Sequence, residues 1–195
     1  AGIENGKSSN IDGIPFKSIK EDVLKNFRKG GLLIMNWTAP NYNGNEDILE
    51  EYAKKVANFL GSLQDDYGIK APIVLNLFPI DGKSWYCQLS KDDYIDLYKK
   101  MQDLLDDEDV SNVIYGYSEA YQPGKNLMDR YPDHNIDVIN VTYLQSRTSI
   151  NLPLYDKSIK DIINQALPFA QEHNTAFGLT TGVESIGDSS VFAST

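Results

Sequence analysis

The stretch APIVLNLFPIDGKSWYCQ, residues 71–88, determines how the rest of the chain is interpreted. Residues 72–78 form an almost unbroken apolar run that stops at Pro79, and a polar, aromatic loop follows. Such a run between Pro and Gly is typical of a parallel strand covered on both faces. In a barrel of alternating strands and helices, the loops after the carboxyl ends of the strands house the chemistry. We therefore expect a functional site within residues 76–88.

Strand and helix patterns alternate on both sides of this stretch. Apolar runs predict strands at 32–37, 72–78, 113–118, 136–143 and 176–181. Helical periodicity predicts helices at 18–28, 46–64, from residue 90 onward, and at 156–174, with Ser18 and Ser90 as caps. This alternation indicates an α/β protein with a parallel sheet and right-handed crossovers.

Length and composition limit the possible partners. With 195 residues, of which 41% are hydrophobic, the chain is long enough to bury one core, so we treat 1–195 as one domain. A net charge of −10 argues against nucleic acid and anionic membrane as partners, and no apolar run predicts membrane insertion. Cys87 is the only cysteine, which excludes an internal disulfide, and no pattern indicates a metal site or a cofactor.

Four segments, in the same order, resemble glycoside hydrolase family 26, the β-mannanase family. They are residues 30–41, 83–86, 129–142 and 178–186. The resemblance implies a (β/α)8 TIM-barrel-like fold, of which this chain covers about five of the eight β/α units. It also implies two strands before residue 1 and one after Thr195. Members of the family are generally secreted or displayed on the cell surface or in the periplasm, so the resemblance implies the same location here.

The resemblance places uncharged residues where the family has its catalytic groups. Ile80 stands at the position of the catalytic acid/base Glu, and Thr180 at that of the nucleophilic Glu. Thr38 replaces a substrate-binding His, Thr142 an Asp, and Asn76 an Arg. A retaining glycosidase needs two carboxyl groups about 5 Å apart, so no catalytic pair is intact in this register.

Other carboxylates could take over the two roles. Asp81 lies one residue past the vacated position, Glu119 follows the strand at 113–118, and Glu184 lies in the loop after Gly182. Any two of them could converge at the barrel mouth. Acidic residues in loops are, however, more commonly solvated charges.

Aromatic and amide side chains near the strand ends remain as candidates for binding a sugar. Rings can stack on sugar faces, and amides can hydrogen-bond hydroxyl groups. Packing inside the barrel is an equally good explanation for the rings of Trp37 and Tyr117. The full set of candidate binding residues is Trp37, Asn76, Trp85, Tyr86, Tyr117, Tyr143 and Gln145.

The sequence therefore predicts a non-catalytic or vestigial family 26-like domain that binds a β-mannan-type polysaccharide. The expected partner is a neutral polysaccharide or oligosaccharide. One alternative is an active retaining endo-β-1,4-mannanase-like enzyme that uses relocated carboxylates. Another is a structural or protein-interaction barrel whose mouth is filled by Phe78, Ile80 and Tyr86.

Overall fold

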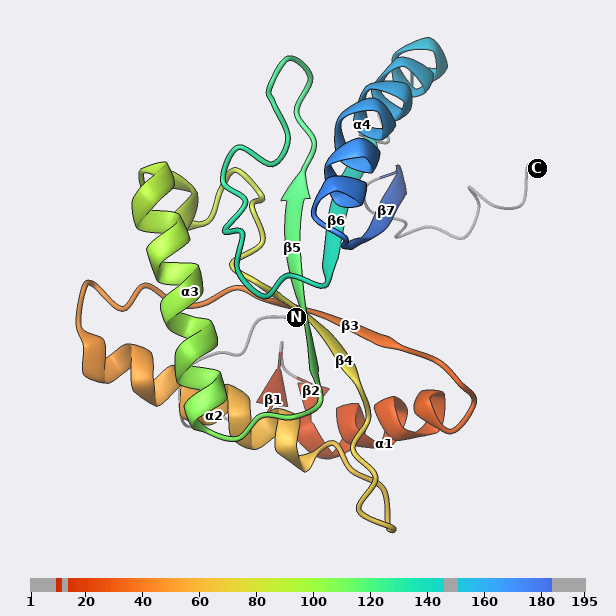
Figure 1. Cartoon of the computed structure of the whole chain (residues 1–195). Helices are drawn as coiled ribbons and strands as arrows, with labels where there is room; N and C mark the ends of the chain where they lie inside the picture. The colour runs from red at the N-terminus through yellow and green to blue at the C-terminus, as the bar shows by residue number, and fades with distance from the viewer. Residues whose placement is uncertain (1–9, 12–13, 146–150, 184–195) are drawn as a thin grey trace.

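A computed structural model describes residues 10–11, 14–145 and 151–183, which form a curved, five-stranded parallel sheet with helices packed around it (Figure 1). The strands stand side by side in chain order, β3-β4-β5-β6-β7. They are β3 (Leu33–Trp37), β4 (Ile73–Leu77), β5 (Val113–Ala120), β6 (Val138–Gln145) and β7 (Ala176–Val183). A short hairpin of β1 (Asn10–Ile11) and β2 (Ile14–Pro15) precedes them. This is a partial (β/α) barrel, and the predicted fold class is confirmed.

Four α-helices connect or flank the strands. They are α1 (Phe16–Phe27), α2 (Glu46–Ser62), α3 (Lys91–Asp107) and α4 (Leu152–Glu172), with the 3-10 turn η1 (Trp85–Gln88) after β4. Residues 121–137, between β5 and β6, contain no helix. The side chains of Asn45, Ser90 and Asn151 accept a hydrogen bond from the first turn of α2, α3 and α4 respectively. Ser90 is therefore confirmed as a helix cap.

Two helix starts differ from the sequence prediction. Helix α1 begins at Phe16, directly after Pro15, and has no side-chain cap, so Ser18 lies inside it. Proline fixes φ and has no capping side chain, so Pro15 marks the start of the helix without accepting a hydrogen bond from its first turn. Helix α4 begins at Leu152 rather than at residue 156, because Asn151 caps the Leu154 N–H at 3.0 Å and Pro153 fits in the first turn.

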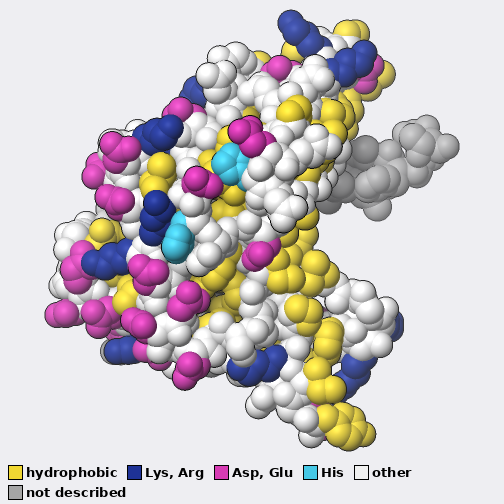
Figure 2. Space-filling model, in the orientation of Figure 1, with side chains coloured by type: hydrophobic (Ala, Val, Ile, Leu, Met, Phe, Trp, Pro, Cys, Tyr) yellow, Lys and Arg dark blue, Asp and Glu magenta, His cyan; other side chains and the backbone are white. Residues whose placement is uncertain are grey.

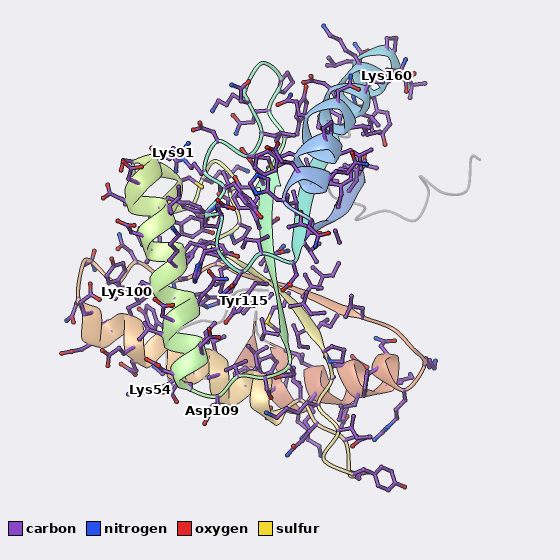
Figure 3. All side chains as sticks on the ribbon, in the orientation of Figure 1. Lys54, Lys91, Lys100, Asp109, Tyr115 and Lys160 are labelled. Carbon is purple, nitrogen blue, oxygen red and sulfur yellow. The ribbon has the colours of Figure 1, made fainter. Side chains whose placement is uncertain are left out.

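Side chains alternate between two faces of the sheet. The outer face packs on the helices: the Tyr115 hydroxyl donates to Asp106 of α3 at 3.2 Å, and the Tyr143 ring stacks on Tyr155 of α4 at 5.8 Å (Figure 3). The opposite, inner face carries Asn36, Asn76 and Asn140, which are joined by hydrogen bonds.

Part of the inner face is open. Ile34 on β3 and Leu144 on β6 are 57% and 41% exposed, and Leu32, just before β3, is 54% exposed. Figure 2 shows hydrophobic side chains along the indented right-hand side of the molecule. Within the described residues, these apolar side chains on or beside the inner face are therefore only partly covered.

Candidate functional site at the carboxyl ends of the strands

Strand β4, which corresponds to the apolar run of residues 72–78, is followed by a residue with unusual backbone geometry. Phe78 has φ of 46°, a left-handed conformation that is a genuine outlier for a bulky side chain. Its ring is fully buried, its N–H donates to the Trp37 carbonyl at 3.1 Å, and its carbonyl accepts from the Tyr94 hydroxyl at 2.9 Å. These contacts hold the turn that leads into the loop.

After this turn the chain pairs with β5 once more. The Ile80 N–H donates to the Ser118 carbonyl at 2.8 Å, and the Ala120 N–H donates to the Ile80 carbonyl at 2.7 Å. This bridge sets Ile80 directly beside Glu119. Both residues line a pocket of roughly 410 Å³ between the loops that follow β4 and β5, and Gln88, Asn126 and Arg130 also line it.

Glu119 is a half-buried carboxyl in this pocket. One of its oxygens, Oε2, accepts from the Tyr117 hydroxyl and from the Met128 N–H, both at 2.9 Å. Burial raises the pKa of Glu119 above its ordinary value, although these two hydrogen bonds favour the charged form and oppose the rise. A carboxyl with a raised pKa can hold a proton, as a general acid must.

Asp81, unlike Glu119, is exposed and accepts its hydrogen bonds from its own loop. Its Oδ1 accepts from the N–H groups of Lys83 and Ser84 at 2.8 Å, and its Oδ2 accepts from the Ser84 hydroxyl at 2.8 Å. Partial burial raises the pKa of Asp81, but these hydrogen bonds outweigh that effect and the pKa lies below its ordinary value. Asp81 therefore closes the turn of its own loop as a carboxylate.

The three candidate replacement acids do not share a set of contacts in the described structure. Asp81 and Glu119 accept hydrogen bonds from different donors, and Glu184 lies outside the described residues. Thr180, at the position corresponding to the family's nucleophile, pairs in register with Thr142 on the neighbouring strand. No ionisable residue stands on the inner face of β6 or β7 within their described lengths, so Thr180 has no adjacent base there.

Three of the aromatic candidates are buried on the face of the sheet that packs on the helices. Trp37 and Tyr117 are 1% and 0% exposed and lie between the sheet and the helices. Tyr143 packs against Tyr121 and Tyr155 on the outer face. Strand alternation explains these placements, because each ring stands on the face opposite to the asparagines. For these three rings, packing is the role that the geometry supports.

The loop aromatics divide into one buried and one accessible ring. Tyr86 is fully buried and meets the Phe78 ring edge-on at 5.4 Å. Trp85 is only half-buried, and its Nε1 donates to the Ala39 carbonyl at 2.8 Å, which ties the loop after β4 to the loop after β3. Trp85 therefore keeps ring surface at the carboxyl ends of the strands.

The two amide candidates also differ. Gln145 is 7% exposed and exchanges two hydrogen bonds with the backbone of Asn151, so it closes the start of α4. Asn76 lies on the inner face, donates to Asn36 Oδ1 at 2.7 Å and accepts from Asn140 Nδ2 at 2.8 Å. We call Asn36, Asn76 and Asn140 the amide ladder.

Three residues of this region were not predicted from the sequence. Asn36 and Asn140 were not recognised as partners of Asn76, although each lies at the same level of its strand, two residues before Thr38 and Thr142. Arg130 was also missed: its guanidinium donates to the carbonyls of Tyr86 and Leu89 at 3.4 and 2.8 Å and holds the loop after β4. Its position next to Tyr131 in the resembling segment 129–142 was the available signal.

Among the described residues, no three His, Cys, Asp or Glu side chains group as a metal site would require. None of the described helices combines the length and apolar character needed to cross a membrane.

Comparison with known proteins shows which fold this is. No protein-family model matches the sequence, and no curated protein matches it. Among solved structures, a GH26 β-mannanase from Bacteroides ovatus superposes with a TM-score of 0.79 at 24% identity, over 92% of this chain and 59% of that one.

Two further β-mannanase structures agree with this result. An endo-β-1,4-mannanase double mutant from Cellulomonas fimi gives a TM-score of 0.74 at 19% identity, over 86% of this chain and 43% of that one. The catalytic domain of a GH26 endo-β-1,4-mannanase from Bacillus sp. JAMB-750 gives a TM-score of 0.74 at 16% identity, over 86% of this chain and 50% of that one. The chain thus spans about half the length of these structures and has the fold of a family 26 glycoside hydrolase domain.

Proposed function

We propose that this chain is a non-catalytic family 26-like domain that binds a β-mannan-type polysaccharide at the carboxyl ends of its strands. The observation that carries the proposal is the absence of charge on the described inner face, where Asn76, Thr142 and Thr180 stand. Double displacement at a glycosidic bond needs a carboxylate to attack and a carboxylic acid to protonate the leaving group. Amide and hydroxyl groups can bind sugar hydroxyls, but they supply neither function.

The geometry around Ile80 supports the same conclusion. Its hydrocarbon side chain lines the pocket beside Glu119 and cannot donate a proton. The half-buried ring of Trp85 supplies an apolar surface against which a sugar face can pack. By the same resemblance, we place the domain outside the cytoplasm, where a polysaccharide would be met.

One observation favours the alternative of an active retaining β-mannanase-like hydrolase. Glu119 has the raised pKa and the pocket position that suit a general acid. It would need a second carboxylate about 5 Å away as nucleophile. The hydrogen bonds that Asp81 accepts within its own loop argue against that role for Asp81.

The third alternative, a purely structural barrel, requires a mouth that is tightly filled by side chains. Phe78 and Tyr86 are fully buried, but Ile80 is only half-buried, so the mouth is not filled at Ile80.

Two measurements on the same protein preparation test the proposal. Isothermal titration with β-1,4-linked mannopentaose should give a saturable binding curve, and a reducing-sugar assay with β-mannan should give no product above the blank. Glu119→Gln and Asp81→Asn should leave the assay at the blank. Turnover that either substitution abolishes would overturn the non-catalytic assignment, and the absence of binding would overturn the glycan assignment.

A further inference from the structure

The pocket of roughly 410 Å³ beside Glu119 lies at the middle of the sheet rather than at an edge. One of its walls is the loop after β4, and the other is the end of β5 with the segment that follows it as far as Arg130. Strand β4 is paired with β3 and β5, and β5 with β4 and β6, so described strands flank both walls. A pocket of this volume can hold a small ligand. We call it the Glu119 pocket.

Glu119 offers this pocket one free oxygen. Its Oε2 is engaged by the Tyr117 hydroxyl and the Met128 N–H, whereas its Oε1 has no hydrogen-bond partner among the residues that the structure describes. Nor does a described Lys or Arg form an ion pair with it, because the nearby Arg130 guanidinium donates to two backbone carbonyls instead. A half-buried carboxylate oxygen without a donor is costly unless water or a ligand satisfies it. Oε1 is therefore an acceptor that a ligand can use.

Three amide side chains also line the Glu119 pocket, those of Gln88, Gln122 and Asn126. Within the described part of the chain, none of these three side chains has a hydrogen-bond partner. The Gln122 amide fits because residue 82 is glycine: a Cβ there would lie 2.9 Å from Gln122 Nε2, and its φ of 76° favours glycine. An amide group offers both donors and an acceptor, which matches a ligand that carries hydroxyl groups.

The charges that line the pocket balance one another. Glu119 and Asp129 are acidic, and Lys125 and Arg130 are basic. A cationic ligand would be repelled by the two basic side chains, and an anionic ligand by the two carboxylates. Ile80 adds a hydrocarbon surface to the lining. These features together favour a neutral ligand that has hydroxyl groups and an apolar face.

We infer that the Glu119 pocket seats one hexose unit of the glycan, with Glu119 Oε1 accepting from a sugar hydroxyl and the three amides bonding the neighbouring hydroxyls. This inference rests on the proposed function and adds which residues hold a sugar unit and which sugars are rejected. A uronic acid unit would bring its carboxylate against Glu119 and Asp129, so the pocket selects against it. Glu119 is thereby a binding residue and not an acid catalyst.

Two substitutions alter the pocket without removing a contact that holds the fold. Glu119→Gln keeps an oxygen for its two protein donors and presents an amide N–H to the ligand in place of the charged acceptor. Gln122→Ala removes an amide that bonds nothing else in the described structure. Glu50→Gln and Gln171→Ala are the matched controls, at exposed positions of α2 and α4 that do not line the pocket. Thermal melting should show that all four variants are folded.

Isothermal titration with mannopentaose gives the first readout. Each pocket variant should bind about threefold to tenfold more weakly than the parent chain, because each loses a hydrogen bond to the sugar or the charge that strengthens it. Both control variants should bind as the parent does. A β-1,4-linked oligomannuronate of the same length should bind the parent about tenfold more weakly than mannopentaose does.

NMR spectra supply a second readout that depends on position. The side-chain amide signals of Gln88, Gln122 and Asn126 should shift when mannopentaose is added. Those of Gln171, which lies outside the pocket, should not shift. A shift at Gln171 with none at the three pocket amides would place the sugar elsewhere and overturn the inference.

The failures of the two proposals are distinguishable. Unaltered affinity in both pocket variants, with sugar binding intact in the parent chain, would overturn the pocket assignment alone. Equal affinity for the oligomannuronate and for mannopentaose would do the same. A parent chain that binds no mannopentaose would overturn the proposed function and, with it, this inference.

Discussion

Glu119 lies near the end of β5 and Asp81 in the loop after the neighbouring strand β4, and their surroundings shift the two pKa values in opposite directions. Burial disfavours the charged form of Glu119, and the hydrogen bonds from Tyr117 and Met128 only partly offset this effect, so its pKa is raised. Asp81 is more exposed, and three hydrogen bonds from its own loop lower its pKa. The first residue therefore destabilises the fold when it is charged, and the second stabilises it when charged.

Glu119→Gln should raise the free energy of unfolding at neutral pH. Glutamine keeps an oxygen for the Tyr117 and Met128 donors but removes the buried charge. An unfolded Glu titrates near 4.5, and the folded one above that. The folded state therefore binds more protons across this interval, and the parent loses stability as pH rises through it. The gain in unfolding free energy of the Gln variant over the parent should be small below pH 4.5 and reach its full size at neutral pH, as measured by urea unfolding.

Asp129 lines the same pocket as Glu119, between the loops after β4 and β5, but its carboxyl is exposed. It therefore provides the control for the Glu119 substitution. Asp129→Asn should not show a comparable pH-dependent gain. An advantage of Glu119→Gln that is equal below 4.5 and at neutral pH would contradict the assigned cause.

Gly116→Ala should destabilise the fold by about 1–3 kcal/mol, the range for overpacking a filled interior. The added Cβ would lie 2.0 Å from Asn76 Oδ1 and must displace the ladder. Gly61→Ala is the control: nothing lies within 4 Å of its Cβ, and alanine in helix α2 should be neutral or stabilising. Chemical denaturation of both variants measures the contrast, and equal stabilities would refute the packing argument.

Among the elements, α3 is hydrogen-bonded to the turn after β4 and to the middle of β5. Its Tyr94 hydroxyl donates to the Phe78 carbonyl at 2.9 Å, and its Tyr98 hydroxyl donates to the Gly116 carbonyl at 3.0 Å. Both tyrosines are fully buried. On the side toward α2, Lys100 forms an ion pair with Glu46 (Figure 3). The left-handed turn at Phe78 is thus held by a helix that begins at Lys91, fourteen residues after β4 ends at Leu77.

Tyr94→Phe should cost about 1–3 kcal/mol of unfolding free energy, because it deprives a buried carbonyl of its side-chain donor. The same substitution at Tyr67, which is 89% exposed, should have almost no effect. Thermal or urea unfolding of the two variants tests this comparison. A Tyr94 variant as stable as the Tyr67 variant would mean that the turn at Phe78 does not depend on α3.

Strands and helices were predictable to within a few residues, because apolar runs and helical periodicity report burial directly. Ser90 was identified as a cap from its sequence context, whereas the starts of α1 and α4 depended on prolines that the pattern did not weigh. The faces of Trp37 and Tyr117 could not be assigned, because a one-residue difference in phase inverts every side chain of a strand. The ladder was not predictable either, since its contacts join residues 40 and 64 apart in sequence.

At the scale of the whole molecule, the curved sheet has one face covered by helices and one face partly open. Ile34 on β3 and Leu144 on β6 are both exposed on the face opposite to the helices. Figure 2 shows hydrophobic side chains along the indented right-hand side of the molecule. Exposed apolar residues on one face of a sheet favour association between molecules.

The double substitution Ile34→Thr and Leu144→Thr should reduce self-association with little change in stability. The two residues are 57% and 41% exposed, and threonine retains the strand preference of a β-branched residue. Light scattering over a concentration series measures the association, and melting measures the stability. A matched pair on the outer surface of α4, Ile163→Thr and Leu167→Thr, should reduce association less.

The Trp85 indole, which donates to the Ala39 carbonyl at 2.8 Å, couples the loop after β4 to the loop after β3. A movement of either loop must break this hydrogen bond or carry the ring with it. Because Trp37, the other tryptophan, is 1% exposed, a change of indole fluorescence on adding a solute reports on these two loops.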